Sequence, residues 1–346
     1  MAATRVAYVY PNSRRELIAQ CEAGTAPDTH LLGLNHLARL GVAAEAREPS
    51  LDQRGRLLPH RLRWHLREVP LPWELRDVEV VFTPLANVIP FAAAARGGPP
   101  VLVYNFGLNT ILRRAGRARR RLLVEALRRT AGVICLGASQ RDELIELTGF
   151  DPAHVPVAIH GVDEQFFTPG EELRERLVVA IGRDLARDYE TFFRAVRRID
   201  AHVVVVVLQR NLEGLDLPPN VEVRERIPYS ELRDLYRRAA VAVVALRSAA
   251  FAYGSEGSGV SAVLEAQASA TPLVASDRPI IRDYLAGGVF VPPEDPDALR
   301  DSIVRVLDDG EHAAALGGAG RRRVEERHTM DDMAAGLAPL MKAAAS

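Results

Sequence analysis

The stretch that decides the fold is YGSEGSGVSAVLEAQASATPLVAS, residues Tyr253–Ser276. An apolar run over residues 241–246 precedes it and has the composition of a buried parallel strand. A loop rich in Gly and Ser follows, and residues 260–268 then place apolar side chains at helical spacing. Thr271-Pro272 ends this helix, and Leu273–Ser276 is the next apolar run. The stretch therefore predicts a strand, a loop, a helix and a second strand of one parallel sheet.

The Gly/Ser loop at the start of this helix has the composition of an anion-binding site. Glycines let the backbone approach a ligand, and the free N–H groups and dipole of a helix N-terminus favour phosphate. Glu256 and Glu265 flank the loop, and carboxylates accept hydrogen bonds from sugar or ribose hydroxyls. One hypothesis is a nucleotide-sugar site, and the alternative is an ordinary strand–loop–helix unit with two solvated glutamates.

Length and composition narrow the class of protein. A chain of 346 residues is longer than one hydrophobic core usually serves, so two domains are expected. A formal net charge of −1 gives no overall attraction to nucleic acid, and two cysteines form neither a disulfide framework nor a zinc site. No apolar run approaches the ~18 residues of a membrane span, and the first strand begins almost at the N-terminus, so we expect a cytoplasmic protein.

Strand-like and helical patterns alternate along both halves of the chain, which predicts an α/β fold with two doubly wound parallel sheets. The segment 159–169 interrupts the alternation, and Pro169-Gly170 reads as a linker. Within the first half, the pattern of residues 29–40 predicts an amphipathic helix that ends at Gly41. In such sheets ligands bind at the carboxyl ends of the strands.

A second loop of the C-terminal half carries basic residues at a strand end. Arg183 and Arg187 follow the apolar run 177–181. Two guanidinium groups there can bind both phosphates of a diphosphate and neutralise the charge of a diphosphate leaving group. Because this loop and residues 254–259 both leave strand ends of one domain, we expect them to converge on one ligand.

With these residues in view, the chain resembles the GT-B-fold retaining glycosyltransferases and is similar to glycosyltransferase family 4. Four motifs carry the resemblance: His160-Gly-Val-Asp163 with Phe167-Thr-Pro169, Gly182-Arg183 with Arg187, the acidic pair Glu256 and Glu265, and Leu264-Glu265-Ala266 followed by Thr271–Ser276. The resemblance implies two Rossmann-like domains that face a central cleft. Residues 1–165 would bind the acceptor, residues 170–325 the nucleotide sugar, and the helix 326–346 would pack back on the N-terminal domain.

The resemblance also implies the activity: a hexosyltransferase that moves a sugar from a nucleoside diphosphate sugar, with UDP favoured, to an acceptor hydroxyl. It implies retention of configuration, no divalent metal and no cofactor, with Arg183, Arg187 and Glu256 as catalytic residues. The residues implied for donor binding are Ser258, Gly259, Val260, Glu265, Arg226 and Ile227. Residues implied on the acceptor or phosphate side are Gly24, Thr25 and Asn105, each of which could instead be a structural loop residue.

Two features of the sequence bear on this assignment. The family places seven residues between its two acidic positions, whereas eight separate Glu256 and Glu265. A catalytically inactive partner subunit is therefore one alternative, and a nucleotide-sugar epimerase is another.

The second feature is the strongly basic stretch Arg113–Arg129. We favour a solvated helix face there over contact with a membrane or a phosphorylated acceptor. Nucleic acid is less favoured still, because aromatic residues are not interleaved with the arginines. The identity of the acceptor and the oligomeric state have no signal in the sequence.

Overall fold

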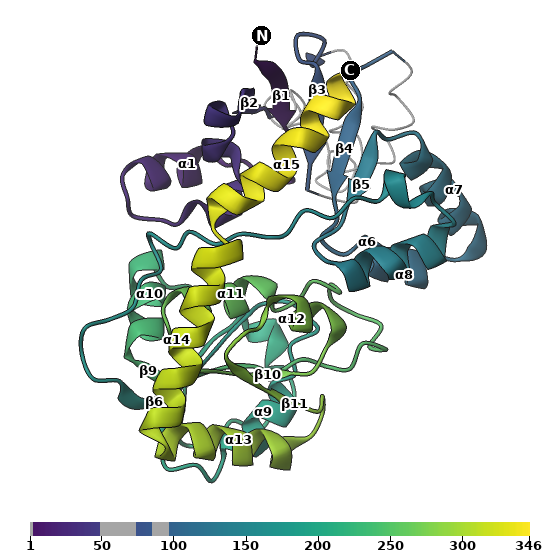
Figure 1. Cartoon of the computed structure of the whole chain (residues 1–346). Helices are drawn as coiled ribbons and strands as arrows, with labels where there is room; N and C mark the ends of the chain where they lie inside the picture. Colours follow the sequence, from purple (N-terminus) through teal and green to yellow (C-terminus); the bar gives the residue numbers. More distant parts are fainter. Residues whose placement is uncertain (1–2, 49–73, 85–96) are drawn as a thin grey trace, which may run out of the picture. The chain divides into compact units, whose positions relative to one another are not determined.

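The computed structural model describes residues 3–48, 74–84 and 97–346 (Figure 1). The chain divides into two compact units. The first contains residues 1–19, 31–159 and 331–346, and the second contains residues 20–30 and 160–330.

A parallel five-stranded sheet forms the centre of the first unit, in the order β2-β1-β3-β4-β5. Its strands are β1 (Thr4–Tyr8), β2 (Val42–Ala46), β3 (Val80–Thr83), β4 (Val101–Tyr104) and β5 (Gly132–Ile134). The helices of this part of the chain are α1 (Arg15–Glu22), α6 (Leu108–Arg114), α7 (Arg117–Arg128), α8 (Ala138–Thr148) and α15 (Met330–Ala345). Apolar side chains of the strands pack against α6, α7 and α8 to form the core of this unit.

The expected amphipathic helix over residues 29–40 is absent. Three short 3-10 helices take its place: η1 (Asp28–Leu31), η2 (Leu34–His36) and η3 (Ala38–Leu40). Gly33 has a φ of 79° and Leu32 a φ of 56°, which interrupt a regular helix at its centre. Helix α15 follows the second unit in sequence and packs its Ala334 against Gly33 (Figure 1).

A parallel six-stranded sheet forms the second unit, in the order β11-β10-β9-β6-β7-β8. Its strands are β6 (Glu175–Ile181), β7 (His202–Val206), β8 (Val221–Arg224), β9 (Ala239–Val244), β10 (Leu273–Ser276) and β11 (Gly288–Val291). Its helices are α9 (Tyr189–Val196), α10 (Tyr229–Arg238), α11 (Val260–Ala268), α12 (Pro279–Tyr284), α13 (Pro296–Asp308) and α14 (Gly310–Arg327). The central strands β6, β7 and β9 are almost wholly apolar because helices cover both faces of the sheet.

The registers of this sheet place two loops side by side. Strands β6 and β9 are direct neighbours, with Val179 opposite Ala242 and Ala180 opposite Val243. Because the strands are parallel, their carboxyl ends lie at the same edge, and the loops 182–188 and 245–259 both leave from it. The sheet therefore positions the two loops that carry the arginines and the glutamates.

Candidate functional site

The loop after β6 holds Arg187 tightly against Gly182. A Cβ placed on Gly182 would overlap the Arg187 guanidinium group, so any larger residue there would require this side chain to move. The Nε of Arg187 is buried and has no hydrogen-bond acceptor among the described residues. Arg183 is exposed at the same loop. The loop thus carries two cations. Arg187 is packed against the backbone and, within the described part of the chain, has a free Nε donor, whereas Arg183 extends into solvent.

The loop after β9 leads into α11 through a left-handed glycine. Gly259 has a φ of 94°, and a Cβ there would lie 2.9 Å from Cγ1 of Val244. Ser258 is buried, and its Oγ has no hydrogen-bond partner among the described residues. The backbone N–H of Ser258 donates to the Ser255 carbonyl at 3.1 Å, and that of Val260 donates to Gly257 at 3.4 Å. Two of the three amides expected to meet a phosphate are therefore engaged within the loop.

Both glutamates of the acidic pair are buried, in contrast to the alternative of two solvated carboxylates. Glu256 is 6% exposed and Glu265 is 5% exposed. Tyr236, on α10, donates its hydroxyl to Oε2 of Glu265 at 3.1 Å. Burial raises the pKa of Glu265 from 4.5 to about 7, against the opposing effects of the Tyr236 hydrogen bond and of the positive charges of Arg187 and Arg183. Glu265 and the two arginines therefore belong to one electrostatic cluster.

The remaining residues predicted for donor binding lie farther along the same edge of the sheet. Arg226 and Ile227 follow β8, which is separated from β6 by β7. Arg226 is exposed and Ile227 is half-buried, and both directly precede α10, which also carries Tyr236. The fold therefore links this segment to Glu265 through a single helix.

Gly24 and Thr25 form the turn that ends α1. Gly24 has a φ of 68°, and the N–H and hydroxyl of Thr25 both donate to the Gln20 carbonyl, at 2.9 and 3.1 Å. Residues 20–30 group with the second unit and not with the rest of the N-terminal half. Hydrogen bonds between Asp163 and both Asp28 and Thr29 anchor this segment. The two residues are exposed on the unit that also contains the arginine and glutamate loops.

Asn105 has a structural environment. Its side chain is fully buried, and its Oδ1 accepts hydrogen bonds from the N–H groups of Gly107 and Leu108 at the start of α6. Its Nδ2 donates to Oδ1 of Asn109 at 2.9 Å and to Sγ of Cys135 at 3.7 Å, and its backbone carbonyl accepts a hydrogen bond from Nε2 of Gln140. This network favours the structural alternative for Asn105, because a side chain with all these bonds has no donor or acceptor directed to solvent.

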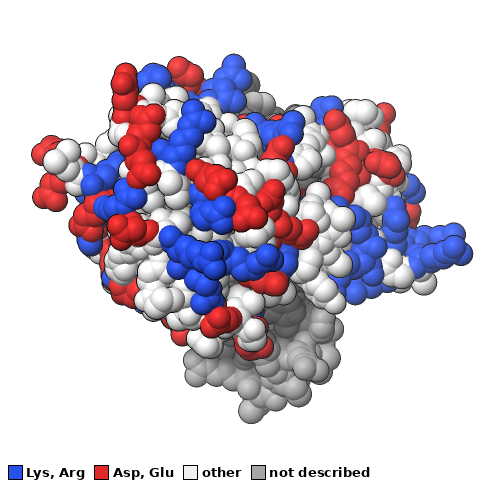
Figure 2. Space-filling view, turned by 90° about the horizontal axis from the view of Figure 1, so that it is seen from below, with Lys and Arg blue, Asp and Glu red and all other residues white. Residues whose placement is uncertain are grey.

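Several arginines of the basic stretch of the first unit have partners on neighbouring segments or on the same helix. Arg113 pairs with Glu143, whereas Arg128 and Arg129 both pair with Glu125. Arg120 donates to the Leu147 carbonyl at 2.6 Å. The other arginines of α7, Arg117, Arg119 and Arg121, are exposed, whereas Leu123 and Leu127 of the same helix are buried. Figure 2 shows a group of basic side chains at its right-hand edge, and basic and acidic side chains interspersed over much of the rest of the view. Within the described residues, no helix is long and apolar enough to cross a membrane.

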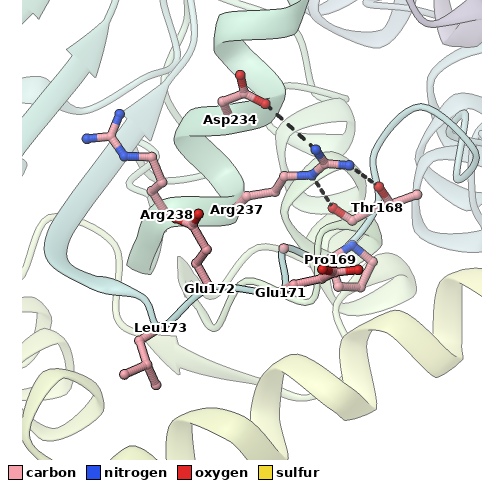
Figure 3. Close-up of a pocket in the computed structure, with 9 residues that line it drawn as sticks. Thr168, Pro169, Glu171, Glu172, Leu173, Asp234, Arg237 and Arg238 are labelled. Carbon is pink, nitrogen blue, oxygen red and sulfur yellow. Dashed lines mark hydrogen bonds and ion pairs between the residues drawn. The ribbon is translucent and has the colours of Figure 1, made fainter.

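A cavity of about 610 Å³ lies at the opposite end of α10 from Arg226 (Figure 3). It is lined by residues 168–173 and by Asp234, Arg237 and Arg238. Arg237 is bound to Thr168 and Asp234, and Arg238 is bound to Glu175. None of the residues predicted for the site lines this cavity, which lies near the amino end of β6.

Two residues of the site have no signal in the sequence. Tyr236 follows the apolar spacing of α10 and reads as a core residue, yet its hydroxyl is bound to Glu265. Asp184 stands between the two arginines, and its carboxylate accepts hydrogen bonds from the backbone of the other loop, at Ser255. Only the arrangement of helix and loops in space identifies these contacts.

Comparisons with known proteins agree with this architecture. The family model "Glycosyl transferases group 1" matches residues 162–323, and the model "Glycosyltransferase Family 4" matches residues 25–166. The D-inositol 3-phosphate glycosyltransferase of Kineococcus radiotolerans is 29% identical over 231 residues, 54% of this chain and 51% of that protein. The chain thus matches about half the length of the curated relatives.

Solved structures share the fold over nearly the whole chain. Sucrose-phosphate synthase from Thermosynechococcus elongatus has a TM-score of 0.73 at 19% identity, covering 98% of both chains. HepE of Anabaena, in complex with UDP and glucose, has a TM-score of 0.71 at 12% identity, covering 98% of this chain and 99% of that one. Since the two family models together match residues 25–323 and the fold is GT-B, this chain belongs to the glycosyltransferases of the family 4 type.

Proposed function

We propose that the protein transfers a sugar from a nucleoside diphosphate sugar, with UDP as the favoured nucleotide, to a hydroxyl group of an acceptor. The observation that carries the proposal is the meeting of two loops at the carboxyl ends of β6 and β9. One loop supplies Arg183 and Arg187, and the other supplies Glu256, Ser258 and the start of α11. Cations, a helix N-terminus and buried carboxylates suit a ligand that has both phosphates and hydroxyls.

The arginines would bind the diphosphate and stabilise its charge as it leaves. Arg187 is suited to this role because packing against Gly182 restricts its orientation, so little reorganisation is needed when charge develops. Its Nε still lacks an acceptor among the described residues, which a phosphate oxygen would supply. We extend the proposal to a reaction without a divalent metal, in which these two guanidinium groups provide the positive charge.

The carboxylates would bind the hydroxyls of the donor. Glu265, which already accepts a hydrogen bond from the Tyr236 hydroxyl, would accept hydrogen bonds from the ribose hydroxyls. Glu256 would accept hydrogen bonds from hydroxyls of the transferred sugar. Retention of configuration is part of the proposal through the family resemblance alone. The relatives support the substrate class: one solved neighbour is a complex with UDP-glucose, and one curated relative is a GDP-mannose-dependent mannosyltransferase.

The test is a thermal-shift screen of the purified protein against UDP, GDP, ADP and dTDP and their common sugar conjugates. A ligand at 100 times its dissociation constant should stabilise the folded protein by about 2.7 kcal/mol. Arg183→Ala should lose this shift, whereas Arg300→Ala, which removes an arginine paired on the surface of α13, should keep it.

Activity assays with the nucleotide sugar that the screen identifies, run with and without acceptor, separate the alternatives. An inactive partner subunit would show no transfer to any acceptor extract, although it could still bind a nucleotide. An epimerase would convert the stabilising nucleotide sugar with no acceptor present. If no nucleoside diphosphate shifts the wild-type melting temperature, the proposed donor site is wrong.

A further inference from the structure

The carboxylate of Asp184 connects the two loops of the proposed donor site. Its Oδ1 accepts a hydrogen bond from the Ala186 N–H at 2.8 Å, within its own loop. The same carboxylate accepts from the N–H of Ser255, at 3.3 Å to Oδ1 and 3.2 Å to Oδ2. These bonds span 71 residues of sequence and join the segment after β6 to the segment after β9.

The backbone of the second loop is shaped to allow this contact. Gly254 has a φ of 86°, and a Cβ there would lie 2.5 Å from both Oδ1 of Asp184 and the backbone N of Ala186. Any side chain at this position would separate the loops. The glycine therefore permits the close approach that brings the Ser255 N–H to the carboxylate.

Ser255 is the first residue of the turn that contains Glu256. Its Oγ accepts a hydrogen bond from the Gly257 N–H at 3.1 Å, and its carbonyl accepts from the Ser258 N–H at 3.1 Å. Glu256 lies between these anchored positions. A displacement of Ser255 would therefore shift Glu256 and Ser258 together, while Arg183 and Arg187 belong to the other loop.

An acidic residue between two diphosphate-binding arginines would ordinarily weaken the binding of an anion. Here the Ala186 and Ser255 amides face the carboxylate, so its charge is partly offset by directed donors. The backbone carbonyl of Asp184 is also held, by Nδ2 of Asn211 at 3.2 Å. The Asp184 carboxylate can therefore hold the backbone of both loops without cancelling the positive charge that Arg183 and Arg187 present to a diphosphate.

Resting on the function proposed above, we infer that Asp184 is a positioning residue that sets the placement of Glu256 relative to the two arginines. The arginines of the Asp184 loop would bind the diphosphate together with the start of α11, whereas the sugar would depend on Glu256, which directly follows the anchored Ser255. Loss of the carboxylate should therefore weaken binding of the sugar portion of the donor more than binding of the nucleoside diphosphate.

The experiment compares Asp184→Ala, Asp184→Asn and the wild type by calorimetric titration with UDP and with UDP-glucose, or with the diphosphate and conjugate that the screen identifies. Asp184→Ala should lose about tenfold in affinity for the conjugate, the effect of one hydrogen bond to a charged group, with a smaller change for the diphosphate. Asp184→Asn, which keeps Oδ1 as an acceptor, should recover part of the loss. Asp309→Ala is the matched control, because Asp309 accepts the His312 N–H at the start of α14.

Two further readouts distinguish positioning from a general loss of structure. Amide hydrogen exchange of residues 254–258, measured without ligand, should accelerate in Asp184→Ala and not in Asp309→Ala. Asp184→Ala and Glu256→Gln should be non-additive, because the first is proposed to act through the second. Equal losses for the diphosphate and the conjugate, or unchanged exchange at residues 254–258, would overturn the inference. If the wild type binds no nucleoside diphosphate, the proposed function fails, and the exchange data still show whether Asp184 holds the loop.

Discussion

Glu265→Gln should make stability less dependent on pH while it weakens nucleotide binding. Glu265 is 5% exposed, and burial raises its pKa from 4.5 to about 7. The folded protein therefore holds this proton at pH values at which the unfolded chain has released it. The contribution to stability is fully present below pH 4.5 and is lost as the pH rises toward 7, because deprotonation then requires a buried carboxylate.

The size of the effect follows from the two pKa values. A rise from 4.5 to about 7 corresponds to about 3 kcal/mol, of which about 2.5 kcal/mol is lost between pH 5 and pH 8. Glutamine has the same shape and no charge, and its carbonyl can still accept the Tyr236 hydroxyl. The variant should therefore lack this part of the pH dependence.

Urea unfolding of the wild type and Glu265→Gln at pH 5 and pH 8 measures the difference directly. The change in unfolding free energy between the two pH values should be about 2.5 kcal/mol smaller in the variant. Glu311→Gln, on the exposed first turn of α14, controls for removal of a carboxylate. Nucleoside diphosphate affinity should nevertheless fall about tenfold in Glu265→Gln, because a neutral amide is a weaker acceptor for ribose hydroxyls. An identical pH dependence in variant and wild type would show that Glu265 is ionised at no cost, and undiminished affinity would remove it from the site.

Two further predictions concern the framework of the second unit. The Arg174 guanidinium donates hydrogen bonds to the carbonyls at the ends of α10 and α11. Arg174→Ala should therefore lower the unfolding free energy, measured by urea titration, by about 3 kcal/mol. Arg176→Ala removes a more exposed ion pair with Asp308 and should cost about 1 kcal/mol or less in the same titration. A Cβ on Gly317 would overlap the Ala270 carbonyl oxygen, so Gly317→Ala should lower the melting temperature; Gly318→Ala meets only Arg322 at 3.4 Å and should raise it, since alanine favours the helix by up to about 1 kcal/mol. A higher melting temperature for Gly317→Ala would show that α14 can move away from Ala270, and equal losses for the two arginine variants would contradict the capping role of Arg174.

The two sheets and the loops at their carboxyl ends follow from local patterns in the sequence. The apolar runs that became β6, β7 and β9 are long enough to indicate buried parallel strands, and Gly/Ser-rich segments mark where they end. The bounds of α11, at Val260–Ala268, agree with the apolar spacing. Local signals suffice here because strand burial and helix amphipathicity are repeated over many neighbouring residues.

Other features depended on contacts between distant segments. Residues 29–40 have helical spacing but fold as 3-10 turns around Gly33, against which α15 packs. Residues 20–30 join the second unit through hydrogen bonds to Asp163, and Asn105 is enclosed by α6 and α8. No local pattern in the sequence predicts either arrangement. The sequence by itself determined the two-sheet α/β fold and where its loops lie. Only the tertiary structure decided that Glu265 is buried against Tyr236 and that Asp184 binds Ser255, because such hydrogen bonds join residues that chain periodicity does not relate.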